Sequence, residues 1–249
     1  MSHTPFQFKQ FTIAHDRCAA KIGTDGVLLG AWASLDSHPY SILDIGTGTG
    51  VIALMLAQRS EAETIDALEL DDNAYEQATE NFENSEWGDR LFCYHAHLYE
   101  FATEIDDQYD LIISNPPFYE ADYKSEDAAR DQARFDDAMP FELLVGAVQR
   151  LLSEEGRFNV IIPYQREQEF IDLAERGNLF PRRITRVLGT PTSEIKRSLI
   201  EFCFHAPDSQ TGRSTPTAEP QITSLVIEKS RHDYTDDYIA LVQDFYLKM

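Results

Sequence analysis

A chain of 249 residues, 43% of them hydrophobic, is long enough for one well-buried α/β domain and cramped for two. No apolar run approaches the ~18 residues of a membrane span. Residues 1–5 lack the basic and apolar blocks of a signal peptide, so we expect a cytoplasmic protein with a single domain over 1–249. Its 21 basic and 43 acidic residues give a net charge of −22, which repels polyanions on average. A nucleic-acid ligand would therefore need a local basic patch.

Strand-like segments alternate with helical patterns along most of the chain. This alternation predicts an α/β fold with a mostly parallel sheet and helices on its faces. In chain order we expect a strand at 41–45, a helix at 51–59, a strand at 64–70, a helix capped by Asp71 or Asp72, strands at 91–95 and 110–114, a helix at 141–152, a strand at 157–162 and a helix at 165–176.

The pattern changes near the carboxyl end. Residues 183–188 and 198–205 are both strand-like, and no helical pattern lies between them, so we expect an antiparallel hairpin. Residues 206–220 are rich in Pro, Ser and Thr and predict an exposed loop. A last strand near Leu225 and a helix over 235–246 should follow.

A glycine-rich turn follows the first predicted strand, and its spacing is Gly-x-Gly-x-Gly. Glycine permits both the tight turn and the close approach of a ligand to the backbone. Glu69 ends the next strand, where a carboxylate can accept hydrogen bonds from two ribose hydroxyls. The alternative is a turn with no nucleotide ligand. The candidate cofactor residues of this region are Asp44, Gly46, Thr47, Gly48, Gly50 and Glu69.

The tetrapeptide Asn115-Pro116-Pro117-Phe118 follows the strand at 110–114. Two prolines restrict the backbone, so the Asn115 side chain and the Pro116 carbonyl can be held rigidly. Each can accept one hydrogen of an exocyclic amine, which leaves the nitrogen lone pair free for a methyl group. Phe118 offers a flat face for an extruded base. The alternative is a Pro-Pro turn that ends a strand, with Phe118 in the core.

These motifs resemble those of bacterial methyltransferases that form N6-methyladenine next to the anticodon of a valine tRNA. The likeness covers nearly the whole chain, and it includes 21–32, 132–134 and 245–247. It implies a Rossmann-like sheet of seven strands with an antiparallel terminal hairpin, S-adenosylmethionine as cofactor, and tRNA as partner, with the adenine 3′ to the anticodon as target. It also implies that 1–35 packs on the cofactor site, with Thr24 and Asp25 near the amino-acid end of the cofactor, and that Asn115 lies beside the cofactor.

The chain departs from that family pattern at one position. His97 stands where the family has an aspartate that contacts the cofactor adenine, and a histidine can also bond that ring. His95 and His97 could instead form a metal pair, but no third ligand has a convincing spacing, and the three cysteines are widely separated, so we expect no metal.

Two sets of basic residues are candidates for contact with RNA. Arg130 and Arg134 lie four residues apart beside the tetrapeptide, although the surrounding acids also fit a solvated face. The other set lies around the predicted hairpin, away from most acids, and is the better candidate: Arg182, Arg183, Arg186, Lys196 and Arg197.

Enzymes that act on other substrates share this tetrapeptide. Enzymes that methylate glutamine in protein release factors carry an additional helical domain before the glycine loop, and only 42 residues precede Leu43 here. DNA adenine methyltransferases usually need a separate target-recognition domain, and no stretch is large enough for one. An adenine in another RNA remains a further alternative, and we expect the protein to act as a monomer.

Overall fold

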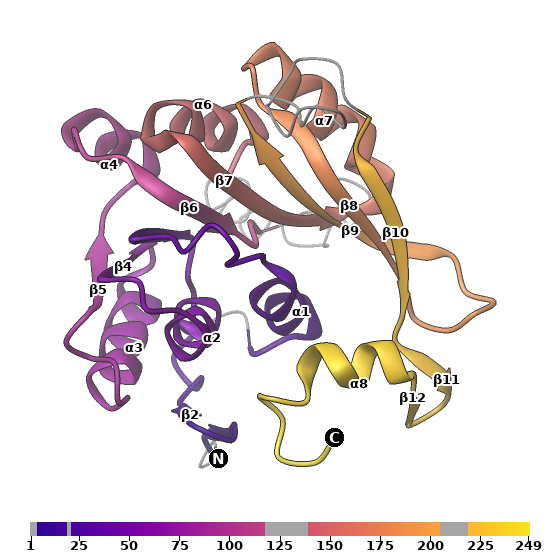
Figure 1. Ribbon diagram of the computed structural model, residues 1–249. Helices are drawn as coiled ribbons and strands as arrows, with labels where there is room; N and C mark the ends of the chain where they lie inside the picture. Colours follow the sequence, from indigo (N-terminus) through magenta and orange to yellow (C-terminus); the bar gives the residue numbers. More distant parts are fainter. Residues whose placement is uncertain (1–3, 19–20, 118–138, 205–218) are drawn as a thin grey trace, which may run out of the picture.

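The computed structural model describes residues 4–18, 21–117, 139–204 and 219–249. Its central feature is a sheet of eight strands in the order β10-β8-β9-β7-β6-β3-β4-β5 (Figure 1). All neighbours from β7 to β5 run parallel, β9 is antiparallel to both β7 and β8, and β10 runs parallel to β8. The strands are β3 Ser41–Ile45, β4 Thr64–Glu69, β5 Leu91–His95, β6 Tyr109–Ser114, β7 Leu152–Pro163, β8 Phe180–Leu188, β9 Ile195–Cys203 and β10 Gln221–Val226.

Helices cover both faces of this sheet. In Figure 1, α4, α6 and α7 lie above it, and α1, α2, α3 and α8 lie below. Two small hairpins, β1–β2 and β11–β12, complete the fold. The helices are α1 Thr24–Trp32, α2 Val51–Arg59, α3 Asp72–Glu83, α4 Leu98–Glu104, α6 Phe141–Leu151, α7 Glu167–Arg176 and α8 Asp236–Val242, with the short 3₁₀ helix η1 Tyr164–Arg166; the hairpin strands are β1 Phe6–Gln7, β2 Thr12–Ile13, β11 Glu228–Ser230 and β12 Asp233–Tyr234.

The two-sided cover explains the apolar runs in the strands. Leu111 and Ile113 of β6 belong to the core under α1, α2 and α3, whereas Ile112 belongs to the core under α4, α6 and α7. A strand buried on both faces needs apolar residues in succession and does not alternate with polar ones. None of the described helices combines the length and apolar character that a membrane span requires.

Most predicted elements are confirmed, and several agree at both ends, such as β3, α2 and β5. The predicted antiparallel hairpin is confirmed, because β8 Phe180–Leu188 pairs antiparallel with β9 Ile195–Cys203. Asp71 caps α3, because its Oδ1 accepts a hydrogen bond from Ala74 N at 2.8 Å. The α/β class and the mostly parallel sheet are therefore as the sequence predicted.

Several details differ from the prediction, among them the following three. The sheet has one strand more than seven, because β10 pairs with β8 outside the antiparallel hairpin. Helix α8 ends at Val242, before the predicted position 246, since Tyr246 forms a β-bridge with Phe8. Helix α4 was not predicted; it has only seven residues, too few for a periodic pattern to be read.

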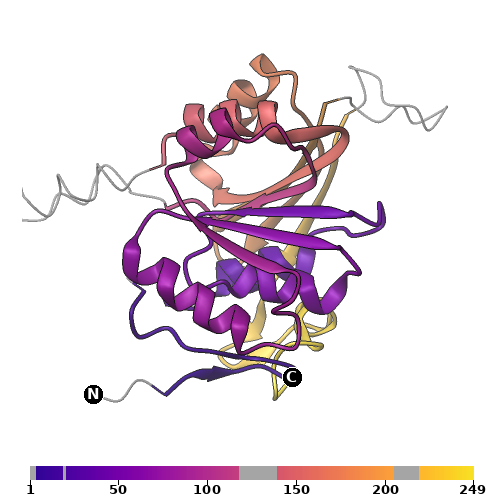
Figure 2. The ribbon, with the colours of Figure 1, turned by 90° about the vertical axis from the view of Figure 1, so that its left-hand side faces the viewer.

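The amino-terminal segment lies against the carboxyl terminus. Besides the bridge of Phe8 with Tyr246, Lys9 N donates to Phe245 O at 2.8 Å. The side view in Figure 2 shows this segment running below the sheet toward the carboxyl end. Of the loop predicted at 206–220, only 219–220 lies within the described residues.

The order of the strands determines where a site can form. The parallel neighbours of β3 are β4 on one side and β6 on the other, so the chain leaves β3 in one direction and returns on the opposite side. In open α/β sheets, ligands bind at the carboxyl ends of the strands at such a switch point.

Candidate active site

The glycine loop begins at the carboxyl end of β3. Gly46, Gly48 and Gly50 have φ values of 72°, 57° and 80°, a region that side-chain-bearing residues rarely adopt. A Cβ at Gly50 would also lie 2.5 Å from Cε1 of Phe82 on α3. The Gly46 and Thr47 amides both donate to Leu68 O of β4, at 2.9 and 3.0 Å. The loop is therefore fixed to the neighbouring strand, and it requires glycine at position 50 for both conformation and space.

Glu69 lies at the end of β4 and contacts this loop directly. Its Oε2 accepts a hydrogen bond from Gly48 N at 2.8 Å. Its Oε1 accepts from Leu70 N at 2.8 Å and Asp71 N at 3.0 Å. A carboxylate has about four acceptor positions, so this one is oriented by the backbone and still has capacity for a hydroxyl donor.

Asp44 is fully buried below the loop. Its Oδ2 accepts a hydrogen bond from Thr47 Oγ1 at 2.6 Å, whereas Oδ1 has no hydrogen-bond partner among the described residues. Burial raises the pKa of this carboxyl to about 7, against the hydrogen bond from Thr47, which lowers it. A buried carboxylate oxygen without a partner is suited to receive a cationic group of a ligand.

His97 caps α4, and this cap determines which nitrogen of its ring is free for a ligand. Its Nδ1 accepts a hydrogen bond from Tyr99 N at 3.1 Å. In a neutral imidazole the proton then lies on Nε2, which becomes a donor. An aspartate at position 97 would offer a ligand only hydrogen-bond acceptors. The histidine in this chain can instead offer a ligand a hydrogen-bond donor at Nε2.

His95 does not form a metal pair with His97. Its Nε2 lies 2.9 Å from Leu70 O and 3.1 Å from Asp72 Oδ1, and its ring stacks on Tyr75 with centroids 5.1 Å apart. Within the part of the chain that the structure describes, no three His, Cys, Asp or Glu side chains gather in a way that could hold a metal ion.

Asn115 leaves β6 next to the glycine loop. Ser114 pairs with Ile45 in the register of β3 and β6, and its Oγ donates to Ile45 O at 2.9 Å. The next residues, Asn115 and Gly46, therefore leave adjacent strands side by side. Pro116 is buried and Pro117 is exposed. The sequence argument that the tetrapeptide faces the loop is supported for Asn115 to Pro117, while Phe118 lies outside the described residues.

Helix α1 packs against both parts of this site. A Cβ at Gly26 would lie 4.0 Å from Asn115 Nδ2 and 3.3 Å from Val51 Cγ1, the first residue of α2. Asp25 accepts a hydrogen bond from Arg197 Nε at 2.8 Å, and Thr24 is exposed. The first turn of α1 thus lies beside Asn115, and Asp25 ties it to β9.

The basic residues of the hairpin do not lie away from acids, and that expectation is wrong. Arg182 and Arg183 lie 3.8 and 3.2 Å from the buried Glu201, and Arg183 also stacks on the Trp32 ring, 3.8 Å from its centroid. Arg186 pairs with Glu167 at 2.7 Å. The antiparallel register places Glu201 opposite Arg183, which the sequence separation concealed.

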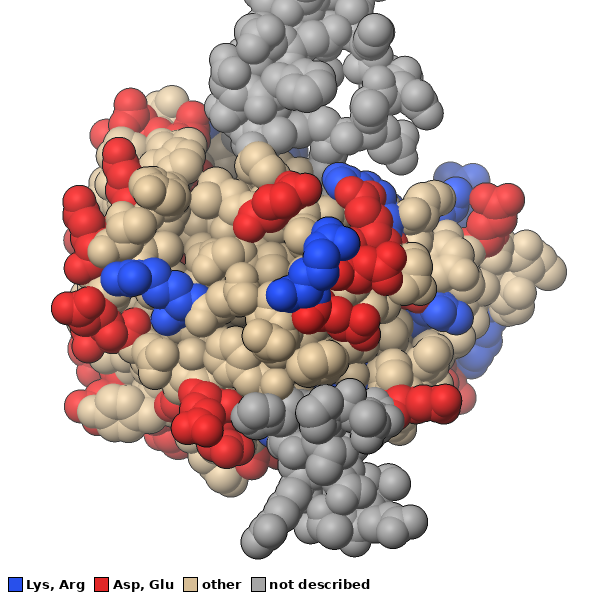
Figure 3. Space-filling model, turned by 90° about the horizontal axis from the view of Figure 1, so that it is seen from above, with Lys and Arg blue, Asp and Glu red and all other residues tan. Residues whose placement is uncertain are grey.

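Lys196 is exposed and forms no ion pair with another described residue. Arg130 and Arg134 lie outside the described residues. Figure 3, which views the α4, α6 and α7 side, shows acidic and basic side chains interspersed there without a broad basic patch. Four of the five basic residues of the hairpin region thus have an acidic partner in this fold: Arg182, Arg183, Arg186 and Arg197.

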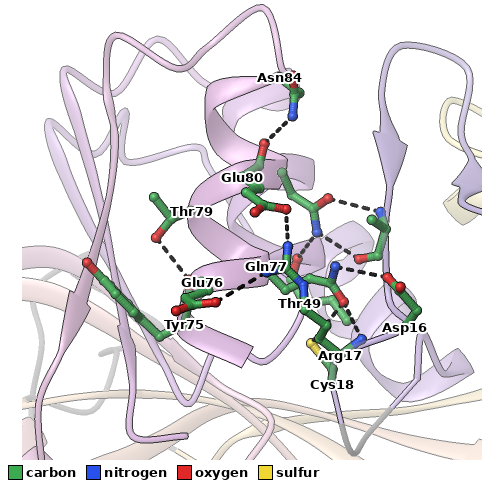
Figure 4. Close-up of polar contacts among 12 residues, drawn as sticks. Asp16, Arg17, Cys18, Thr49, Tyr75, Glu76, Gln77, Thr79, Glu80 and Asn84 are labelled. Atoms are coloured by element: carbon green, nitrogen blue, oxygen red, sulfur yellow. Dashed lines mark hydrogen bonds and ion pairs between the residues drawn. The ribbon is translucent and has the colours of Figure 1, made fainter. Parts of the chain in front are cut away.

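Two buried amides of α3, which sequence reasoning missed, hold the amino-terminal segment on the site (Figure 4). Asn81 accepts from Ala14 N and donates to Ala14 O and Thr49 O, all at 2.9 Å. Gln77 Oε1 accepts from Arg17 N at 2.8 Å. The sequence signal that could have identified Gln77 and Asn81 is the presence of two amides four residues apart, beside the apolar stripe of α3.

Comparisons with known proteins agree with this geometry. A family model described as the methyltransferase small domain matches residues 26–169. Proteins named tRNA1(Val) (adenine(37)-N6)-methyltransferase are 59% identical, one from Christiangramia forsetii over the full length of both chains and one from Flavobacterium johnsoniae over 98% of this chain and 100% of that one.

A solved structure of a predicted O-methyltransferase from Agrobacterium tumefaciens has a TM-score of 0.63 at 18% identity. It covers 89% of this chain and 96% of its own, and at this identity it establishes the fold alone. The full-length identity to the curated relatives and the match to the family model establish more. The chain belongs to the methyltransferase small-domain family and, within it, to the tRNA1(Val) (adenine(37)-N6)-methyltransferase family.

Proposed function

We propose that this protein transfers a methyl group from S-adenosylmethionine to N6 of adenine 37 in tRNA1(Val), the adenine 3′ to the anticodon. The observation that carries the proposal is the position of Asn115 beside the glycine loop, in a chain that is 59% identical over its full length to relatives named for this reaction. The same arrangement would suit any exocyclic amine, so the identity to relatives selects the substrate.

The residues around the loop fit the cofactor. The loop glycines present bare backbone, and nothing lies within 4 Å of a Cβ built at Gly48. Glu69 would accept hydrogen bonds from the ribose hydroxyls, and the unpartnered Oδ1 of Asp44 would receive the ammonium group. Thr24 and Asp25, at the amino end of α1, would border the amino-acid end. When bound, the cofactor supplies an activated methyl group on a sulfonium.

His97 would bind the cofactor adenine as a donor. Because Nδ1 is occupied by the cap of α4, Nε2–H is the group available to a ring nitrogen that accepts a hydrogen bond. The cap also fixes the ring plane, so this contact would be pre-oriented.

Catalysis by the turn would depend on position and dipoles. Asn115 Oδ1 and the Pro116 carbonyl would each accept one hydrogen of the adenine amino group and direct its lone pair at the methyl carbon. Pro117 would restrict the backbone, and Phe118 would stack on the extruded adenine. The nitrogen forms a bond to the methyl carbon as the sulfur–carbon bond breaks, and the proton released from nitrogen passes to solvent.

The RNA-contacting residues remain proposals in a modified form. Lys196 is exposed and available to a phosphate, whereas Arg182, Arg183 and Arg197 already have acidic partners and would contact RNA only through their outer edges. Arg130 and Arg134 are proposed to contribute from the segment after the turn. Such a sparse surface would bind an unpaired loop better than a duplex.

The experiment is methylation of total RNA from a strain that lacks this gene, with labelled S-adenosylmethionine, followed by nucleoside analysis and mapping. N6-methyladenine at position 37 of tRNA1(Val) is the expected product. Label in release factor alone would replace this proposal with glutamine methylation, and label at another adenine would replace the substrate but keep the reaction. A tRNA with guanine at position 37 is the matched control and should receive no methyl group.

A further inference from the structure

A cavity of ≈710 Å³ lies at the junction of the amino and carboxyl ends of the chain. Its walls come from β1, the start of α1, the turn after β8, the β11–β12 hairpin, α8 and the last residues of the chain. The volume falls in the range of about 300–1,000 Å³ that holds small-molecule ligands, and it is ample for one nucleobase. No residue of the glycine loop lines it.

This cavity and Asn115 both lie next to the first turn of α1. Gly23 and Thr24 line it, and Gly26 lies against Asn115. A helix rises about 1.5 Å per residue, so the two sites flank the same helical turn. A polymeric substrate that places one base at Asn115 would have a neighbouring residue within reach of the cavity.

The lining is aromatic and largely fixed by the core. The rings of Tyr234 and Tyr238 lie 5.3 Å apart, and Tyr246 stacks on Phe8 with centroids 5.8 Å apart. The hydroxyls of Tyr238 and Tyr246 are hydrogen-bonded to each other. Tyr238 is buried and Tyr234 is half-buried, and both residues line the cavity. Pre-positioned rings of this kind are the usual surface for an unpaired base.

The negative charge of the protein makes a contact that does not depend on charge useful for binding RNA. Most arginines near the site are already paired with carboxylates, among them Arg183 with Glu201 and Arg197 with Asp25. With a net charge of −22, phosphate contacts alone would give weak binding that is lost at moderate salt. Stacking is independent of charge and contributes to affinity at any salt concentration.

We propose that this cavity binds one unpaired base of the tRNA anticodon loop, a neighbour of the adenine that is methylated, by stacking on Tyr234. The inference rests on the proposed function and adds a second base-binding site to it.

The test measures binding of an anticodon stem-loop RNA by fluorescence anisotropy. Tyr234→Ala should weaken binding about tenfold, the value of one stacked base, while Tyr234→Phe should stay close to the wild type. Cofactor affinity and the dependence of RNA affinity on salt should be unchanged in both. Tyr99→Ala, which removes an exposed tyrosine of α4 far from the lining, is the matched control.

A second arm fills the cavity without removing a ring. Thr190→Trp should weaken RNA binding to a similar degree, since Thr190 lines the same cavity. Single abasic substitutions along the loop then identify the bound base. One abasic position, next to the target adenine, should weaken binding of the RNA to the wild type. The same abasic RNA and the intact RNA should bind Tyr234→Ala with equal affinity.

The second base-binding site would be overturned if Tyr234→Ala and Thr190→Trp both fold and bind RNA as tightly as the wild type. It would also be overturned if each abasic substitution weakened RNA binding equally in the wild type and in Tyr234→Ala. If the wild type methylated no tRNA, the proposed function itself would fail. The two failures are therefore distinguishable.

Discussion

The cofactor side of the sheet and its opposite edge are built on different principles. From β3 to β5 each candidate site residue lies within a few positions of a strand end, and its partners lie close by on the same or the neighbouring loop, as with Glu69 and Gly48. Around β8, β9 and α1 the important contacts join residues far apart in sequence, as with Arg197 and Asp25, 172 positions apart. The first region is encoded locally, and the second exists only after folding.

This difference separates chemistry from recognition. The residues proposed to bind the cofactor and the proposed acceptors at Asn115 and Pro116 lie at the ends of strands, where geometry can be held closely. The candidate RNA-binding features lie on surfaces that several distant segments assemble. Mutations in the first region should therefore act on cofactor binding, on turnover or on the stability of the glycine loop, and those in the second on stability or RNA affinity.

The sharpest test of the locally encoded region is Asn115→Ala. Loss of one preorganised acceptor should lower kcat about 10²- to 10³-fold, while the cofactor Kd changes little, because the bonds of Asn115 are to the acceptor amine. Single-turnover methylation and calorimetric titration of the cofactor measure the two quantities. A parallel loss of cofactor affinity would contradict the role assigned to this side chain.

Gly50→Ala should be strongly destabilising, by about 2–4 kcal/mol, because a left-handed φ and a clash with Phe82 act together. Gly48→Ala is the matched control, since it has the same strain but no neighbour within 4 Å, and it should cost about 1–2 kcal/mol. Urea unfolding of the free protein gives both values. Equal losses would mean that packing of the loop on α3 is unimportant.

The attachment of the amino-terminal segment to the cofactor side is tested by Asn81→Ala. Three backbone groups, one buried and two partly buried, would lose their partner, so the free energy of unfolding should fall by about 2–3 kcal/mol. Asn84→Ala removes an exposed amide of the same helix that bonds only to Glu80 O, and it should change stability by less than about 0.5 kcal/mol. Faster proteolysis within residues 4–18 should accompany the first change and not the second.

The pH dependence of cofactor binding tests Asp44. Because burial raises its pKa to about 7, the free protein holds a proton that cationic ligand binding must displace. Cofactor affinity should fall about tenfold for each pH unit below 7 and level off above it. Asp44→Asn should bind weakly and without this dependence, whereas a slope that persisted in the variant would assign the titration elsewhere.

The stability of the free protein should change in the opposite sense. The pKa of Asp44 rises on folding from its ordinary value of 3.8, so its contribution favours the folded state at low pH and is lost as pH rises from about 4 to 7.

The smallest effect is expected at the assembled surface. Lys196→Ala should weaken RNA binding about threefold at low salt and reduce the magnitude of the slope of log K against log salt by about one. Arg150 of α6, which pairs with Asp106, provides the control, and its replacement by alanine should leave the slope unchanged. A slope that is unaffected by Lys196→Ala would exclude a phosphate contact there.

The sequence by itself determined the parts whose signals are short in range. Glycines before a helix, a carboxylate at a strand end and prolines after a buried strand have conformational meanings that hold wherever they occur, so β3, α2 and the turn at Asn115 were predictable. The fold class followed from the alternation of these elements.

Only the tertiary structure decided which distant side chains meet. Glu201 pairs with Arg182 and Arg183 because of the strand register. Asn81 holds Ala14 because α3 packs against the amino-terminal segment, and β10 joins the sheet because β8 leaves an edge open. Such contacts depend on the packing of complete elements. A local pattern of residues carries no information about the partner that packing will supply.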